Sequence, residues 1–237
     1  VRGRVMALMG GSMRLSVLVS AVSGGVLYDL VGDRWTFVAA GAVSVAGMVA
    51  VLPEARHTSD RIVGAGGGWA NLFRVFRRHR RRLIRGGVFG MLVTTAREGR
   101  MVVLLLVGVA LGLSPAAIGG LVAVGYTADL ALFPVSGYVM DRFGRKAAMF
   151  PAYGLLAVGL GMLATADTAT VAIIAGVLMG IGNGMSAGSI FTIGSDLAPE
   201  EGTASFLSGV SVLTGTGRVI GPVLVGVVAK AFGLGAA

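Results

Sequence analysis

The segment 94–103, TTAREGRMVV, carries Arg97, Glu98 and Arg100 inside a long apolar stretch. If a helix enters a membrane near Gly86, Arg97 lies roughly 16 Å further along, close to the bilayer midplane. A charge there costs at least about 2.5–3.5 kcal/mol, so it needs a polar cavity or a partner. Arg97 and Arg100 share a helix face, and Glu98 points about 100° away. A carboxylate among arginines can change protonation as its partners move, which proton coupling requires. The alternative is a structural ion-pair cluster.

Other polar residues lie within apolar segments. Asp129, in GYTADLALF, is a second candidate proton carrier, and its expected partner is an arginine of the segment that contains Arg97. The alternative role for Asp129 is a buried acid that locks two helices together. Arg14 and Arg218 are candidate substrate contacts or partners of the acids, and Asn183 is expected to line a cavity.

The composition indicates an all-α polytopic membrane protein. Of 237 residues, 55% are hydrophobic and 13% are charged, whereas a soluble domain has about 25% charged residues. The chain has no cysteine, and its two histidines, His57 and His79, lie in a polar segment. We therefore expect no metal site, no cofactor and no hydrolytic triad in the membrane. An intramembrane enzyme is not expected, because no nucleophile lies near a base in an apolar segment.

Seven apolar segments are long enough to span a bilayer. They are approximately residues 5–27, 35–52, 84–111, 115–138, 147–166, 170–194 and 204–229. Ser114-Pro115 predicts a capped helix start. Glycines at every fourth position from Gly176 to Gly188 predict a close-packed helix seam. The one long polar segment divides the chain into 1–52, a basic segment 53–82, and 83–237.

Basic residues set the orientation. With the N-terminus in the cytoplasm, fourteen Lys and Arg residues lie inside and two lie outside. This asymmetry predicts a multi-pass protein of the inner (plasma) membrane with a cytoplasmic central segment, and it makes nucleic-acid binding unnecessary. Within the basic segment, one side of a predicted helix would carry Trp69, Leu72, Phe73 and Phe76, which are spaced to share one helix face. Most of the arginines of this segment fall on the other side. This arrangement predicts an interfacial helix on anionic lipids, the alternative being an ordinary basic loop.

The sequence GYVMDRFGRKAAM, residues 137–149, stands between two apolar segments. It resembles the signature loop of the major facilitator superfamily. The matching positions are Gly137, Asp141, Arg142, Gly144, Arg145 and Lys146. In that family the loop occurs between helices two and three and again between eight and nine. The single copy and the preceding long loop make this chain look like a fragment that covers helices five to eleven.

The resemblance implies a helical bundle that transports small molecules by rocking two halves around a central cavity. We expect proton-coupled efflux, with Glu98 and Asp129 as coupling acids. Arg97, Arg100 and Arg218 would tune these acids or hold an anionic substrate. The resemblance also implies a cytoplasmic latch in which Asp141 contacts the chain start near Arg2 and Arg4. The alternative is a truncated, non-transporting membrane protein or a partner subunit, since only one signature loop and an odd number of spans are present.

Overall fold

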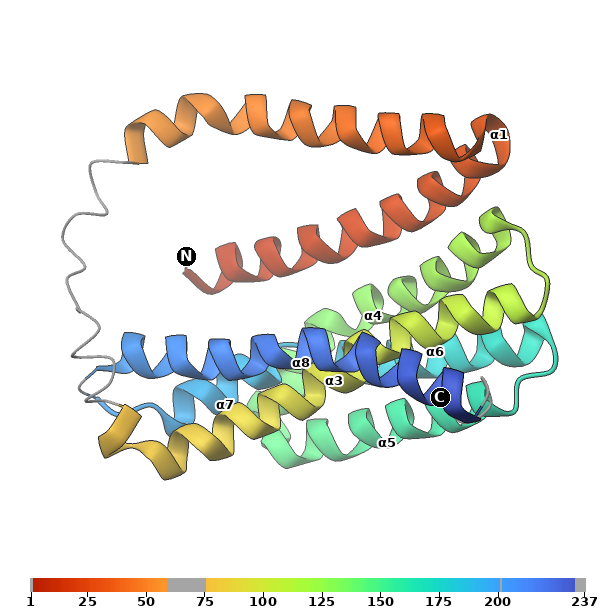
Figure 1. Ribbon diagram of the computed structural model, residues 1–237. Helices are drawn as coiled ribbons and strands as arrows, with labels where there is room; N and C mark the ends of the chain where they lie inside the picture. The colour runs from red at the N-terminus through yellow and green to blue at the C-terminus, as the bar shows by residue number, and fades with distance from the viewer. Residues whose placement is uncertain (1, 59–75, 201, 233–237) are drawn as a thin grey trace.

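The computed structural model describes the backbone of residues 2–58, 76–200 and 202–232, and the side chains within 11–52, 76–200 and 202–231. The described residues form helices joined by short turns, and no strand occurs among them. The long helices lie roughly parallel to one another (Figure 1). The helices are α1 (Arg2–Thr58), α3 (Arg80–Ala110), α4 (Pro115–Phe143), α5 (Arg145–Ala164), α6 (Ala169–Met185), α7 (Ser189–Leu197) and α8 (Thr203–Phe232).

Five helical segments are long and apolar enough to cross a membrane, counting only described residues. One of them, Gly11–Leu52, contains the second predicted span and most of the first. Helix α3 is absent from this set although its 31 residues are ample in length. Its predicted span carries Arg97, Glu98 and Arg100 near its centre. The fold has to shield those charges for α3 to cross a bilayer.

Helix α1 bends sharply at Gly32, where the backbone has φ 77° and ψ 179°. L-residues with a side chain rarely adopt this φ, so glycine allows the chain to turn without a loop. The two arms of α1 run in opposite directions (Figure 1). The second arm exposes large apolar side chains such as Phe37, which is 75% exposed. Such a surface suits a lipid environment.

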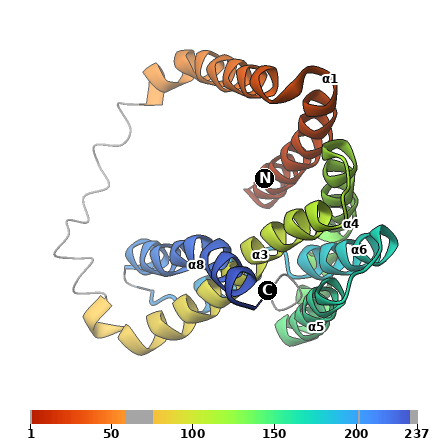
Figure 2. The same ribbon diagram turned by 45° about the vertical axis from the view of Figure 1, so that its right-hand side comes forward.

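The first arm of α1 packs against α4 (Figure 2). Close approach is possible because glycines face the partner backbone. A Cβ atom at Gly25 would lie 2.7 Å from the Pro115 carbonyl oxygen, and Gly119 faces the Ala21 carbonyl in the same way. The Asp29 carboxylate accepts a hydrogen bond of 3.1 Å from the Ala116 amide in the first turn of α4. Its charge also complements the helix dipole there.

The predicted cap of α4 is confirmed, and so is most of the glycine seam. The Ser114 hydroxyl accepts from the Ala117 amide at 3.2 Å, with Pro115 opening the helix. Gly180 and Gly184 of α6 face the backbone of α4 so closely that a Cβ would collide with it, and Gly176 lies in ordinary contact range. Glycine therefore brings α4 and α6 into near backbone contact.

Gly188 does not join the seam, and the predicted span 170–194 is not one helix. The chain leaves α6 after Met185 and re-enters a helix at Ser189. Gly188 adopts the left-handed conformation, with φ 77° and ψ −10°, which only glycine adopts easily. The Ser189 and Ser186 side chains are buried at this break, with 0% and 1% exposure. The break thus brings polar groups into the bundle.

The predicted polar segment 53–82 is helical at both ends, because α1 continues to Thr58 and α3 begins at Arg80. Of the expected interfacial helix, Trp69, Leu72 and Phe73 lie outside the described residues. Phe76 is described, and it packs against a cluster formed by Leu83, Phe206 and Val210. The division into two bundles and a linker stays a prediction.

Candidate transport site

Asp129 lies near the middle of α4, and only 1% of its surface is exposed. Its Oδ1 accepts from Arg14 Nε at 3.1 Å, and its Oδ2 accepts from Asn183 Nδ2 at 2.6 Å. One carboxylate therefore links α1, α4 and α6. A buried carboxylate needs such partners, because burying an unpaired charge costs several kcal/mol.

The expected partner of Asp129 was an arginine of α3, and that prediction is wrong. The partner is Arg14 of α1, which lies 115 positions before Asp129 in the sequence. The two interior arginines of α3 instead donate to backbone carbonyls, one at the α6–α7 break and the other within α6. Arg14 also lies over the Phe133 ring, 4.4 Å from its centroid, so an aromatic face and a carboxylate share the guanidinium.

Arg97 and Arg100 share one face of α3, as their spacing predicted. Arg97 Nη2 donates to the Ser186 backbone oxygen at 3.1 Å and to its hydroxyl at 2.7 Å. Arg100 Nη1 donates to the Met179 carbonyl at 3.0 Å, and its guanidinium lies 5.7 Å from the centroid of the Tyr126 ring. Ser186 is the C-cap of α6, where the helix dipole favours a cation such as Arg97, whereas Met179 lies further inside the same helix.

These guanidinium groups are incompletely satisfied. The Nε atoms of Arg97 and Arg100 are buried and have no hydrogen-bond partner among the described residues, and the same holds for Asn183 Oδ1. Most buried polar atoms in proteins do have a partner, so each exception calls for an explanation. The site therefore combines buried positive charge with unused hydrogen-bonding capacity.

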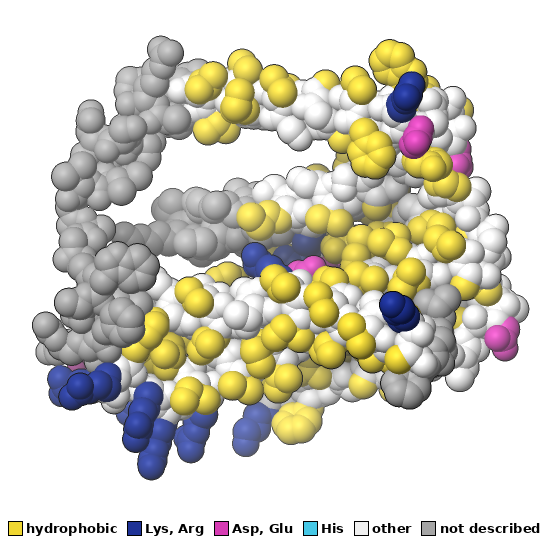
Figure 3. All heavy atoms as spheres, in the orientation of Figure 1, with side chains coloured by type: hydrophobic (Ala, Val, Ile, Leu, Met, Phe, Trp, Pro, Cys, Tyr) yellow, Lys and Arg dark blue, Asp and Glu magenta, His cyan; other side chains and the backbone are white. Residues whose placement is uncertain are grey.

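Glu98 is not part of this cluster. Its Cβ lies beside Gly221 of α8, its side chain is partly exposed, and no ion pair to it occurs in the described part of the chain. Arg218 is exposed on α8. The structure thus brings together Arg14, Arg97, Arg100, Asp129 and Asn183, and no hydrogen bond or ion pair among the described residues joins Glu98 or Arg218 to this group. Figure 3 shows cationic and acidic side chains close together in the opening between the first arm of α1 and α8.

The signature loop turns between α4 and α5 at Gly144, where the backbone has φ 86°. Arg145 forms a two-pronged ion pair with Asp196 of α7, with Nε–Oδ2 at 2.6 Å and Nη2–Oδ1 at 2.7 Å. Arg142 donates to the Tyr138 hydroxyl at 2.6 Å. The ion pair between Arg145 and Asp196 joins the first residue of α5 to the C-terminal end of α7.

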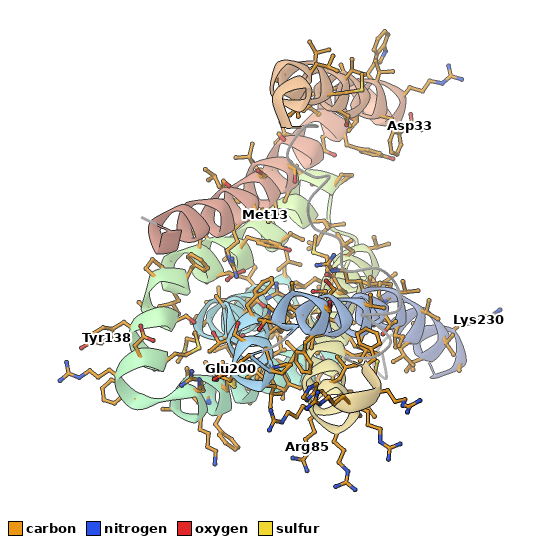
Figure 4. All side chains as sticks on the ribbon, turned by 90° about the vertical axis from the view of Figure 1, so that its left-hand side faces the viewer. Met13, Asp33, Arg85, Tyr138, Glu200 and Lys230 are labelled. Carbon is orange, nitrogen blue, oxygen red and sulfur yellow. The ribbon has the colours of Figure 1, made fainter. Side chains whose placement is uncertain are left out.

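The remaining signature residues, Gly137, Asp141 and Lys146, are exposed. Asp141 has no hydrogen bond or ion pair with another described side chain. Its expected contacts, the side chains of Arg2 and Arg4, lie outside the described residues. In Figure 4, Arg85 and other basic side chains point away from the bundle.

Sequence reasoning missed Ser186 and Asp196. Ser186 stands in the apparently continuous glycine-rich span, and its only signal was the SAGS sequence, whose small residues permit a helix break. Asp196 stands between two spans, at the C-terminal end of α7. An acid there, on the side predicted to hold the signature loop, could have been matched with Arg145.

The family sequence model described as Major Facilitator Superfamily matches residues 1–222. The chain belongs to the major facilitator superfamily. Comparisons with curated proteins and with solved structures give no match. Members of the superfamily are membrane transporters rather than enzymes, so this chain is a multi-pass member of a transporter family that acts on small molecules.

Proposed function

We propose that this facilitator exports small molecules in exchange for protons by alternating access. The observation that supports the proposal most directly is the ion pair between Arg14 and Asp129. Arg14 belongs to the predicted first unit, 1–52, and Asp129 belongs to the predicted second unit, 83–237. A pair that joins the two units is well placed to sense protonation and to control their relative movement.

The mechanism follows from the charge on Asp129. While it is ionised, Arg14 and Asn183 hold it, and α1 stays against α4. When Asp129 takes up one proton, its attraction for Arg14 falls, and the two units can separate on that side of the membrane. Release of that proton on the other side restores the ion pair. One proton then moves in one direction for each cycle of substrate movement in the other.

The remaining candidate residues receive subordinate roles in this proposal. Glu98 lies toward α8 and would be a second proton carrier. Arg97 is within electrostatic range of both Asp129 and Arg100, and the two arginines would tune the environment of that carboxylate. Arg218, exposed on α8, would meet substrate in the opening between the units. Asn183 would hold the Asp129 carboxylate in position during the cycle.

We further propose that the protein resides in the inner (plasma) membrane with its basic segment in the cytoplasm. Exposed arginines at positions 77, 78, 80, 81, 82 and 85 gather at one end of α3. Cations so close to a predicted membrane surface are attracted to anionic lipid headgroups, at about 1 kcal/mol each. The signature loop would lie on the same side and act as a latch.

The test uses the purified chain in liposomes that contain pyranine, a trapped pH indicator. Benzenesulfonate and benzyltrimethylammonium are added separately under a pH gradient, because one is an anion and the other a cation, and neither titrates. The wild type is expected to couple proton movement to one of them. Asp129→Asn, which keeps the shape but cannot ionise, should lower this coupled flux at least about 10-fold.

The matched control is Asp167→Asn, because Asp167 is exposed in the turn between α5 and α6. This variant should transport normally. Equal coupled flux in Asp129→Asn and the wild type would contradict the proposal. A folded wild type that moves protons with neither compound would favour the alternative, a non-transporting membrane protein or partner subunit.

A further inference from the structure

We propose that Arg97 and Arg100 bind the anionic group of the substrate, and that the substrate is a small organic anion with a carboxylate or a phosphate. This inference rests on the proposed transport function, because it names the substrate class of the same site. It assigns the arginines a direct role, in addition to any effect on Asp129.

The first argument is the balance of charge. The cluster holds Arg14, Arg97 and Arg100 against Asp129, that is, three positive charges and one negative charge, for a sum of +2. The one carboxylate is already paired with Arg14 at 3.1 Å. If the negative charge of Glu98, which faces α8, is also counted, the summed charge is still +1. Buried charges are retained where they are paired, so this cluster favours a further negative partner, which no ion pair among the described side chains supplies to Arg97 or Arg100.

The second argument is the contrast with the other arginines. Arg145 has Asp196 as its counter-ion, and it is exposed as well. The arginines near the start of α3 are also exposed, so water solvates them. Arg100 is only 5% exposed, and among the described residues neither it nor Arg97 lies within 4 Å of a carboxylate oxygen. Arg97 and Arg100 therefore differ from the surface arginines in having neither full solvation by water nor a carboxylate counter-ion among the described residues.

The third argument is hydrogen bonding. Each guanidinium uses one terminal nitrogen on the backbone of α6 or on Ser186, and each leaves its buried Nε without a partner. Carbonyl oxygens fix the orientation of both groups but do not neutralise them. A guanidinium held in this way retains N–H donors in a planar fork, which is the arrangement that carboxylates and phosphates accept.

The surroundings favour an organic anion. The Arg100 guanidinium lies 5.7 Å from the centroid of the Tyr126 ring, and apolar residues such as Leu104 are buried one turn further along α3. Arg97 is partly exposed and would meet the anion first, whereas Arg100 lies deeper. An anion with an apolar body can satisfy the charge and also keep water out.

The experiment measures ligand binding through the thermal stability of the full chain in detergent at pH 7. Benzoate and phenyl phosphate are the anionic probes, and benzyltrimethylammonium is the matched cation with the same ring. At roughly ten times its dissociation constant, a bound anion should raise the midpoint of unfolding by about 3–6 °C. The shift should saturate with concentration. Whichever of the two anions gives the larger shift identifies the preferred anionic group.

The variants Arg97→Gln and Arg100→Gln should each weaken anion binding at least about 10-fold, and Arg85→Gln, at an exposed site, should leave it unchanged. If Arg100→Gln does not fold, Arg97→Gln carries the test, because Arg97 is partly exposed. The proposal is overturned by stabilisation from the cation alone, by the absence of a shift with either anion, or by anion shifts that persist in Arg97→Gln. Because binding is measured without a pH gradient, it can succeed or fail independently of proton coupling.

Discussion

The described part of the molecule has two ion-paired regions, one at the middle of α4 and one just beyond its end, where α5 meets α7. Asp129 and Arg14 have side chains 1% and 18% exposed, and they join helices that are distant in sequence. Arg145 and Asp196, just beyond the end of α4, are 52% and 42% exposed, although their geometry is better because two nitrogens meet two oxygens. Ideal geometry does not determine the energy, because water screens the exposed pair far more strongly than the buried one. The interior pair should therefore govern stability and function, and the end pair should adjust them.

Removing Arg14 should have the largest effect on stability. Arg14→Met leaves the Asp129 carboxylate buried with Asn183 as its only described partner, and it should lower the free energy of unfolding by about 3 kcal/mol. The measurement is denaturant unfolding in detergent micelles. The control is Arg34→Met, on the exposed surface of the same helix α1, which should change little.

A double variant tests the cause of this loss. Arg14→Met combined with Asp129→Leu removes both charges, and it should recover much of the lost stability because no unpaired charge is then buried. If Arg14→Met is as stable as Arg34→Met, the interior pair is not energetically distinct from a surface charge, and the comparison between the two regions fails.

A smaller effect is expected from glycines in the same two regions. An alanine Cβ at Gly184 would lie 2.6 Å from the Asp129 carbonyl oxygen, so Gly184→Ala should push α6 away from α4 and cost about 1–3 kcal/mol. At Gly137, near the end of α4, no atom lies within 4 Å of that position. Gly137→Ala should gain about 0.5–1 kcal/mol from helix propensity. Thermal unfolding in detergent compares the two variants, and equal effects would show that the α4–α6 seam is not tight.

The sequence alone could predict the features that depend on neighbouring positions. The spacing of Gly180 and Gly184 predicts a seam on one face of a helix, and the three-residue spacing of Arg97 and Arg100 puts them on one face of α3. Periodicity does not tell which other helix that face meets, so the choice of Arg14 over the arginines of α3 as the partner of Asp129 could not be derived. That pairing depends on the close packing of α1 on α4 through Gly25 and Gly119.

The break in α6 illustrates a different limit. Residues 170–194 are apolar enough for one span, and regular glycine spacing indicates a continuous helix. Whether a glycine such as Gly188 adopts the left-handed conformation depends on tertiary contacts. Here the Ser136 hydroxyl donates to the Ala187 carbonyl at 2.9 Å, and Arg97 donates to the Ser186 carbonyl, so carbonyls freed at the break are satisfied by other helices. These donors come from other helices, so the sequence of residues 170–194 alone cannot predict that the helix breaks there.

The smallest expected effect is at the exposed pair, and it sharpens the comparison through salt. Asp196→Asn should lower the free energy of unfolding by at most about 1 kcal/mol, because both side chains of the pair are about half exposed. At an ionic strength of about 1 M the Debye length is roughly 3 Å, so the effect should nearly vanish. The loss caused by Arg14→Met should persist in the same salt, since the interior pair is shielded from ions. Unfolding of both variants at low and high salt therefore distinguishes the two regions. A loss of stability in Asp196→Asn that is large and insensitive to salt would contradict the comparison, because the exposed pair would then stabilise the fold as strongly as a buried one.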